Sequence, residues 1–139
     1  METVSVKEEI AAPIDAVWAL LRDFGDIRGW SFGTTLEGVE GSGVGSIRRM
    51  QTPGGLFVER CEALDDAGHS FSYAILESPW KIDGYLSKVQ LSALGADRCE
   101  IEWSSHFEPT AATPDGLTAG VEKMYKRFIS NLRKATGAV

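Results

Sequence analysis

The sequence predicts an α+β fold in which a curved antiparallel sheet of seven strands wraps around one long C-terminal helix. Two observations predict it. Strand-length runs separated by turn residues fill the middle of the chain, and a long amphipathic segment follows them. An antiparallel sheet must cover its apolar face, and this last segment is the only one long enough to do so. We therefore expect the helix and the sheet to enclose an internal cavity.

The strands follow from alternation and from turn residues. Residues 2–10 place Val4 and Val6 on one side, which predicts the first strand. From Phe32 to Phe107, six further strands are predicted. The breaks between them are rich in Gly, Pro, Asp and Ser and lie at residues 40–43, 52–55, 65–68, 78–80 and 95–97.

Helices are predicted on both sides of these six strands. Two short helices lie between the first and second strands: one starts at Pro13 and carries apolar residues at helical spacing, and residues 27–30 form the second. The long helix is predicted to start with Thr113 as cap and Pro114 in the first turn, and to end near Ala135. Its apolar face consists of Leu117, Val121, Met124, Phe128 and Leu132.

Composition limits the classes of function. The chain has 139 residues, 43% of them hydrophobic, which suits one domain spanning residues 1–139. A net charge of −6 argues against nucleic acid, which needs a basic surface. No run approaches the ~18 apolar residues of a membrane span, and no secretory signal is evident. We expect a cytoplasmic monomer or homodimer.

The cysteines and histidines give little sign of catalysis or metal binding. Cys61 and Cys99 form no CxxC motif, so we interpret them as reduced core residues. The alternative is a reactive thiol at Cys61 assisted by His69 or His106. Because the histidines lack ligand spacing with Cys, Asp or Glu, we predict neither a metal nor a cofactor.

Hairpin geometry predicts a row of polar side chains on the inner face of the sheet. Residues directly opposite in an antiparallel pair share one face. Centring the 52–55 turn on Pro53 and Gly54 places Arg48 opposite Glu59, with Met50 opposite Phe57 beside them.

Two further turns extend this row. Centring the next turn on Asp66 places Glu59 opposite Tyr73, and centring the one after on Pro79 places Tyr73 opposite Tyr85. Because the neighbours on this face are apolar, the row points inward. Burying an unpaired charge costs several kcal/mol, so these groups must satisfy one another, hold water or receive a ligand. The alternative is a buried ion pair with tyrosine hydrogen bonds that serves packing alone.

The chain resembles the START-like SRPBCC superfamily, the birch-pollen-allergen or helix-grip fold, in its polyketide cyclase/dehydrase and lipid-transport branch. The resemblance runs from Val4 to about Ala135 and covers nearly the whole chain. It rests on APIDAVW at 12–18, RDF at 22–24 followed by Trp30, GSIR at 45–48, Glu59-Arg60, SFSY at 70–73 and Gly84-Tyr85. This fold includes receptors, carriers and enzymes.

Branches of the superfamily imply roles for the row. In plant lachrymatory-factor synthases, a pocket arginine, a glutamate and two tyrosines match Arg48, Glu59, Tyr73 and Tyr85. In abscisic-acid receptors, the glutamate and the second tyrosine match, and two loops flank the mouth of the pocket. The receptor's loop sequences and its hormone-binding lysine are absent here, and the catalytic lysine of norcoclaurine synthases has no counterpart.

Three hypotheses follow. The first is a cavity that binds a small, mostly apolar molecule, with Arg48 orienting an anionic or carbonyl oxygen and Tyr73 and Tyr85 donating hydrogen bonds. The second is a cyclase, dehydratase or isomerase that uses Glu59 as acid and base, with Arg48 and Tyr85 stabilising an oxyanion. The third is an interaction module with a filled core. The predicted cavity wall consists of Met50, Phe57, Phe71, Ser87, Trp103, Val121, Met124 and Phe128.

Overall fold

The computed structural model describes residues 1–31 and 33–138. Phe32, from which the strand-rich segment is predicted to run, and Val139 lie outside the described residues. Seven strands form one antiparallel sheet in the order β1-β7-β6-β5-β4-β3-β2. Their bounds are β1 (Glu2–Ile10), β2 (Thr35–Glu40), β3 (Ile47–Thr52), β4 (Gly55–Asp65), β5 (Ser70–Glu77), β6 (Ile82–Gly95) and β7 (Arg98–Pro109).

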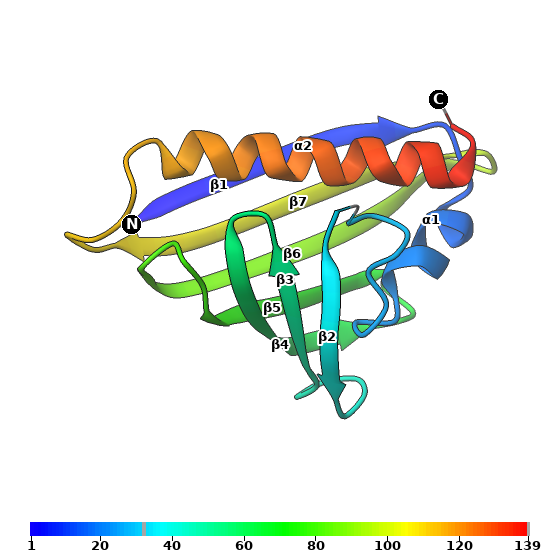
Figure 1. Ribbon diagram of the computed structural model, residues 1–139. Helices are drawn as coiled ribbons and strands as arrows, with labels where there is room; N and C mark the ends of the chain where they lie inside the picture. Colours follow the sequence, from blue (N-terminus) through cyan, green and yellow to red (C-terminus); the bar gives the residue numbers. More distant parts are fainter. Residues whose placement is uncertain (32, 139) are drawn as a thin grey trace.

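In the described part of the chain, two helices accompany the sheet: α1 (Ile14–Leu21) and α2 (Leu117–Thr136). Figure 1 shows α2 lying lengthwise across the sheet beside β1 and β7, with α1 near its C-terminal end. The predicted helix-grip arrangement is confirmed. Neither described helix is long and apolar enough to cross a membrane.

Residues 27–30 form hydrogen-bonded turns instead of the second predicted helix. The amides of Trp30 and Ser31 both donate to the carbonyl of Ile27, at 3.2 and 2.9 Å. The Asp26 carboxylate accepts a hydrogen bond from the backbone amide of Arg28 at 3.1 Å. Such a bond can begin a helix, but Gly29 in this segment disfavours its continuation, so only the turn forms.

The long helix begins three residues later than predicted. Gly116, with a φ of 73°, is its N-terminal cap residue. The Thr113 hydroxyl does not cap the helix, because it accepts a hydrogen bond from the amide of Thr110 and donates one to the carbonyl of Lys81, both at 2.8 Å. Thr113 therefore fastens the segment before α2 to the start of β6.

The hairpin registers are confirmed for the first turn and shifted by two residues for the next two. Arg48 lies opposite Glu59, as predicted. Glu59 lies opposite Ile75, and Tyr73 lies between Cys61 and Ser87. The predictions for Glu59 with Tyr73 and for Tyr73 with Tyr85 are therefore wrong.

The shift has a local cause at each turn. The β4–β5 turn covers residues 66–69, one residue later than the predicted break, and contains His69 at a φ of 56°, and two bulges interrupt this hairpin. The β5–β6 turn contains Lys81 at a φ of 52°, and Gly84, near the start of β6, is also at positive φ. A two-residue shift preserves the face, so the polar side chains still point inward.

Asn131 joins α2 to the turn that precedes β2. Its Nδ2 donates to the carbonyl of Trp30 at 3.0 Å, and both residues are buried. A buried carbonyl that loses its donor costs about 1–3 kcal/mol. This bond therefore holds Trp30 under the helix.

We expect Asn131→Ala to lower the free energy of unfolding by about 1–2 kcal/mol, because the Trp30 carbonyl loses its partner. Ser130→Ala, at the adjacent half-buried position, is the matched control and should change stability by less than about 0.5 kcal/mol. Urea denaturation measures both. Equal stability of the two variants would show that the Asn131 bond does not stabilise this end of the helix.

A candidate ligand cavity

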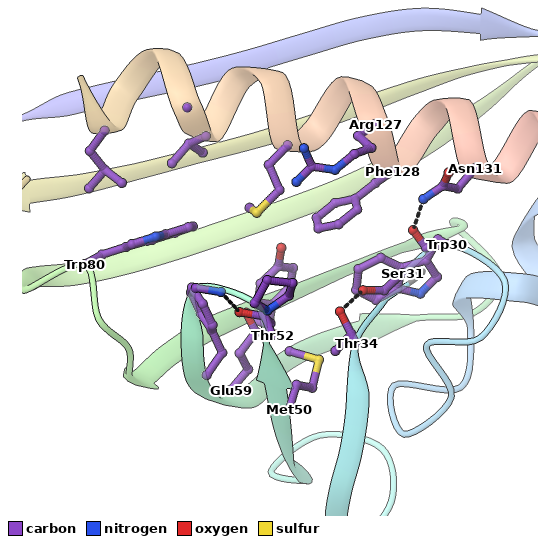
Figure 2. A pocket seen from close by; sticks show the side chains of 18 residues that line it. Trp30, Ser31, Thr34, Met50, Thr52, Glu59, Trp80, Arg127, Phe128 and Asn131 are labelled. Carbon is purple, nitrogen blue, oxygen red and sulfur yellow. Dashed lines mark hydrogen bonds between the residues drawn. The ribbon is translucent and has the colours of Figure 1, made fainter. Parts of the chain in front are cut away.

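A cavity of about 540 Å³ lies between α2 and one half of the sheet. Its lining comes from α2, from β3 to β5, from the two turns that join β3 to β4 and β5 to β6, and from the segment before β2 (Figure 2). The lining residues are Trp30, Ser31, Thr34, Met50, Thr52, Pro53, Gly54, Phe57, Glu59, Tyr73, Trp80, Leu117, Gly120, Val121, Met124, Arg127, Phe128 and Asn131.

Burial distinguishes the mouth of the cavity from its floor. Pro53, Gly54 and Arg127 are exposed and surround the opening. Glu59 and Tyr73 are buried and form the polar part of the floor. A molecule that enters past the turns therefore meets an apolar wall before it reaches a carboxylate and a phenol.

The turns at the mouth contact each other. A Cβ added to Gly55 would lie 3.2 Å from Cγ of Pro79, so the backbone of one turn packs on the proline of the other. The rings of Phe57 and Trp80 meet edge to face, with centroids 4.9 Å apart. The β3–β4 and β5–β6 turns thus form one continuous wall.

Glu59 forms a buried ion pair with Arg48 across β3 and β4. Nε of Arg48 donates to Oε1 of Glu59 at 2.9 Å, and Nη2 lies 2.8 Å from the same oxygen. Nη2 itself makes no hydrogen bond with a described residue. The described residues also provide no hydrogen bond to the second carboxylate oxygen, Oε2, so a lone pair remains for the cavity.

Arg48 is enclosed and does not line the cavity. Its Nη1 donates to the carbonyl of Phe24 at 3.0 Å, and its side chain is 1% exposed. The guanidinium carbon lies 3.9 Å from the ring centroid of Phe24, 5.0 Å from that of Trp30 and 5.1 Å from that of Tyr73. These cation–π contacts place aromatic rings around the charge. The expectation that Arg48 touches a ligand oxygen is therefore corrected: Arg48 contacts Glu59 and does not reach the cavity.

Burial raises the pKa of Glu59, and the nearby Arg48 guanidinium opposes this effect without overcoming it. The carboxylate loses most of its hydration, while Arg48 engages only one of its oxygens. The sequence alone did not show whether burial or the charge of Arg48 has the larger effect on the pKa of Glu59. In the structure, desolvation is larger.

Three tyrosines lie at and below the floor. Tyr73 lines the cavity, and its hydroxyl accepts a hydrogen bond from Nε1 of Trp103 at 3.1 Å. Tyr85 does not line the cavity, because its hydroxyl bonds to that of Tyr125 on α2. Burial raises the pKa of all three phenols, so they act as neutral hydrogen-bonding groups.

Five of the eight predicted wall residues line the cavity: Met50, Phe57, Val121, Met124 and Phe128. The other three predicted wall residues point to the same face of the sheet but do not line the cavity: Phe71, Ser87 and Trp103. Ser87 donates to the carbonyl of Ser104 at 2.9 Å, and Trp103 stacks on Tyr125 with centroids 5.7 Å apart.

Several residues of the site were not predicted from the sequence. Trp30 and Trp80 come from turns, and Arg127 and Asn131 lie beside the predicted apolar stripe of α2. Tyr125 lies one residue after Met124 and is fully buried. Tyr125 lies four residues after Val121, and this helical spacing could have placed it on the buried face of the helix.

The alternative of a reactive thiol is not supported by the geometry. Cys61 is buried, its Sγ faces the carbonyl of Ala63 at 3.5 Å, and burial raises the pKa of its thiol. His69 contacts Asp15 at 3.3 Å, and His106 is exposed. Among residues 1–31 and 33–138, no cluster of three His, Cys, Asp or Glu side chains could hold a metal ion.

The fold and the site define a helix-grip protein with an internal cavity under its long helix. The chain belongs to the polyketide cyclase/dehydrase and lipid transport family, whose model matches residues 1–137. This confirms the START-like superfamily inferred from the sequence.

Solved structures share the fold. The protein XoxI from Bacillus cereus is 23% identical with a TM-score of 0.86, and the match covers 98% of this chain and 96% of that one. Norcoclaurine synthase from Thalictrum flavum, in complex with dopamine and hydroxybenzaldehyde, is 19% identical with a TM-score of 0.70, covering 96% and 84%. At these identities the likeness concerns the fold.

The direction of the Glu59 pKa is testable with Glu59→Gln. A raised folded-state pKa means that the folded protein holds the proton more tightly than the unfolded chain does. The resulting stability is present below the ordinary pKa of 4.5 and is lost as pH rises through the raised value. Because glutamine does not titrate, the stability of the wild type relative to the variant should fall as the pH rises above 4.5.

Denaturant unfolding at several pH values measures this difference. Glu62→Gln is the control on the same strand, since Glu62 pairs with Arg60 on the outer face at 2.7 Å. A wild-type advantage over Glu59→Gln that grows with pH would mean that Arg48 dominates and that the pKa is lowered.

Proposed function

We propose that residues 1–139 act as one domain that binds a small, mostly apolar molecule in this cavity. The observation that carries the proposal is the cavity itself, with an apolar wall and two buried polar groups, Glu59 and Tyr73, at its floor. Its volume of about 540 Å³ lies within the usual range of ligand pockets, about 300–1,000 Å³. The third hypothesis required a filled core, and the cavity argues against it.

The floor specifies the polar group of the ligand. Oε2 of Glu59 is an acceptor, and the Tyr73 hydroxyl has a proton to donate while it accepts from Trp103. A hydroxyl group both donates and accepts, so one hydroxyl on the ligand satisfies both residues. We propose that Arg48 and Tyr85 support these two residues from behind.

Gly120 supports the proposal from the helix side. Glycine in a helix is less favourable than alanine by up to about 1 kcal/mol. Gly120 nevertheless occupies the first turn of α2, lines the cavity, and has nothing within 4 Å of an added Cβ. The missing side chain leaves room at the mouth.

An enzyme of the cyclase, dehydratase or isomerase type is the second candidate, and the raised pKa of Glu59 favours it. A carboxyl group whose pKa lies closer to neutrality is better suited to give and take a proton. In this alternative, Glu59 transfers the proton and Tyr73 donates a hydrogen bond to the developing oxyanion. Arg48 holds the Glu59 carboxylate in place.

Gly120→Leu should block the cavity without harming the fold. We expect it to weaken binding of N-phenyl-1-naphthylamine, an uncharged apolar fluorophore, by at least about tenfold while keeping or raising stability. Ala119→Leu is the matched control, because Ala119 is exposed on the same turn and does not line the cavity. Fluorescence titration measures both variants. Unchanged affinity in Gly120→Leu, or no binding to the wild type, would contradict the proposal.

Native mass spectrometry of the purified protein, followed by release and re-incubation of any retained molecule, separates the two candidates. A binding protein should return the molecule with its mass or isomeric form unchanged. An enzyme should convert it, and Glu59→Gln should stop the conversion while binding persists. Conversion at an equal rate by Glu59→Gln would remove Glu59 from the proposed acid–base role.

A further inference from the structure

Arg127 is the one positively charged side chain among the described residues that line the cavity. It is exposed, stands at the mouth, and forms no ion pair with a described residue. Figure 2 shows it extending from α2 on the side of the helix that faces the cavity. Its charge is therefore available to a molecule in the opening.

Two other cations of α2 are already paired. Lys126 contacts Glu122 at 3.1 Å, and Arg133 contacts Glu8 at 2.8 Å. Both pairs lie outside the cavity lining. Arg127 thus differs from these two residues in lacking a carboxylate partner and in facing the cavity.

The floor is unsuited to an anion. Glu59 provides a carboxylate oxygen there, and Arg48 is enclosed behind it with its guanidinium directed at Glu59 and Phe24. An anionic group at this depth would meet a like charge and lose its hydration. The same group at the mouth stays partly hydrated and reaches Arg127.

We infer that the ligand is an amphipathic acid, bound with its anionic group at Arg127 and its uncharged end at Glu59 and Tyr73. This inference rests on the proposed function and adds the charge and the orientation of the ligand. The chain carries a net charge of −6, so its overall field repels anions. Selection of an acid must therefore come from the local charge of Arg127.

A pair of related fluorophores tests the inference. The probes are 8-anilinonaphthalene-1-sulfonate, which carries one negative charge, and N-phenyl-1-naphthylamine, which has similar rings and no charge. Arg127→Gln should weaken binding of the sulfonate by about three- to tenfold, in the range of a partly exposed ion pair, and leave the uncharged probe unaffected. Lys123→Gln removes the same charge from an exposed position of α2 outside the lining and should change neither affinity.

The outcomes separate this inference from the proposed function. Wild-type binding of both probes, blocked by Gly120→Leu, with a loss confined to the sulfonate in Arg127→Gln, supports it. Equal sulfonate affinity in Arg127→Gln and wild type, or an equal loss in Lys123→Gln, overturns it while the uncharged probe still reports a binding cavity. Binding of neither probe to the wild type overturns the proposed function and this inference with it.

Discussion

The buried ion pair between Arg48 and Glu59 is the interaction on which both the fold of this region and the character of the cavity depend. Two charges removed from water remain stable only if each satisfies the other, and removing one partner leaves the other uncompensated. Arg48 also contacts the rings of Phe24, Trp30 and Tyr73. The pair therefore fixes β3 against β4 and draws the segment before β2 over the sheet.

Much of the fold was predictable because its turns are marked in the sequence, yet registers were predictable only where the turn is tight. Pro53 and Gly54 alone separate β3 from β4, and the pairing of Arg48 with Glu59 follows from that length. The next two turns contain His69 and Lys81 in left-handed conformations and shift the pairing by two residues. The polar side chains still point inward, as predicted, because a shift of two residues keeps each side chain on the same face of the sheet. Their exact cross-strand neighbours, in contrast, depend on the bulges.

The sequence did not predict which inward-facing residues line the cavity and which pack directly against the helix. Alternation shows that Phe71 and Trp103 face inward, as Met50 does, but it gives no information on the distance between the sheet and the helix at each strand. Residues of β7 pack directly under α2, where Trp103 stacks on Tyr125. The strands that line the cavity among the described residues are β3, β4 and β5. Contacts such as the hydrogen bond between Asn131 and Trp30 join residues that are far apart in the sequence, so no local sequence pattern predicts them.

Two sides of α2 differ in how tightly they are packed. On one side, Ile129 and Leu132 are fully buried, and Arg133 pairs with Glu8 on β1, so this side supplies packing. On the side that lines the cavity, Leu117, Met124 and Phe128 are only partly buried, and Gly120 offers no side chain. Apolar surface left uncovered there forfeits about 25 cal/mol for each Å² that packing would have removed from water. A helix that is well packed on one side can tolerate that loss on the other, which is why a cavity can lie beneath it.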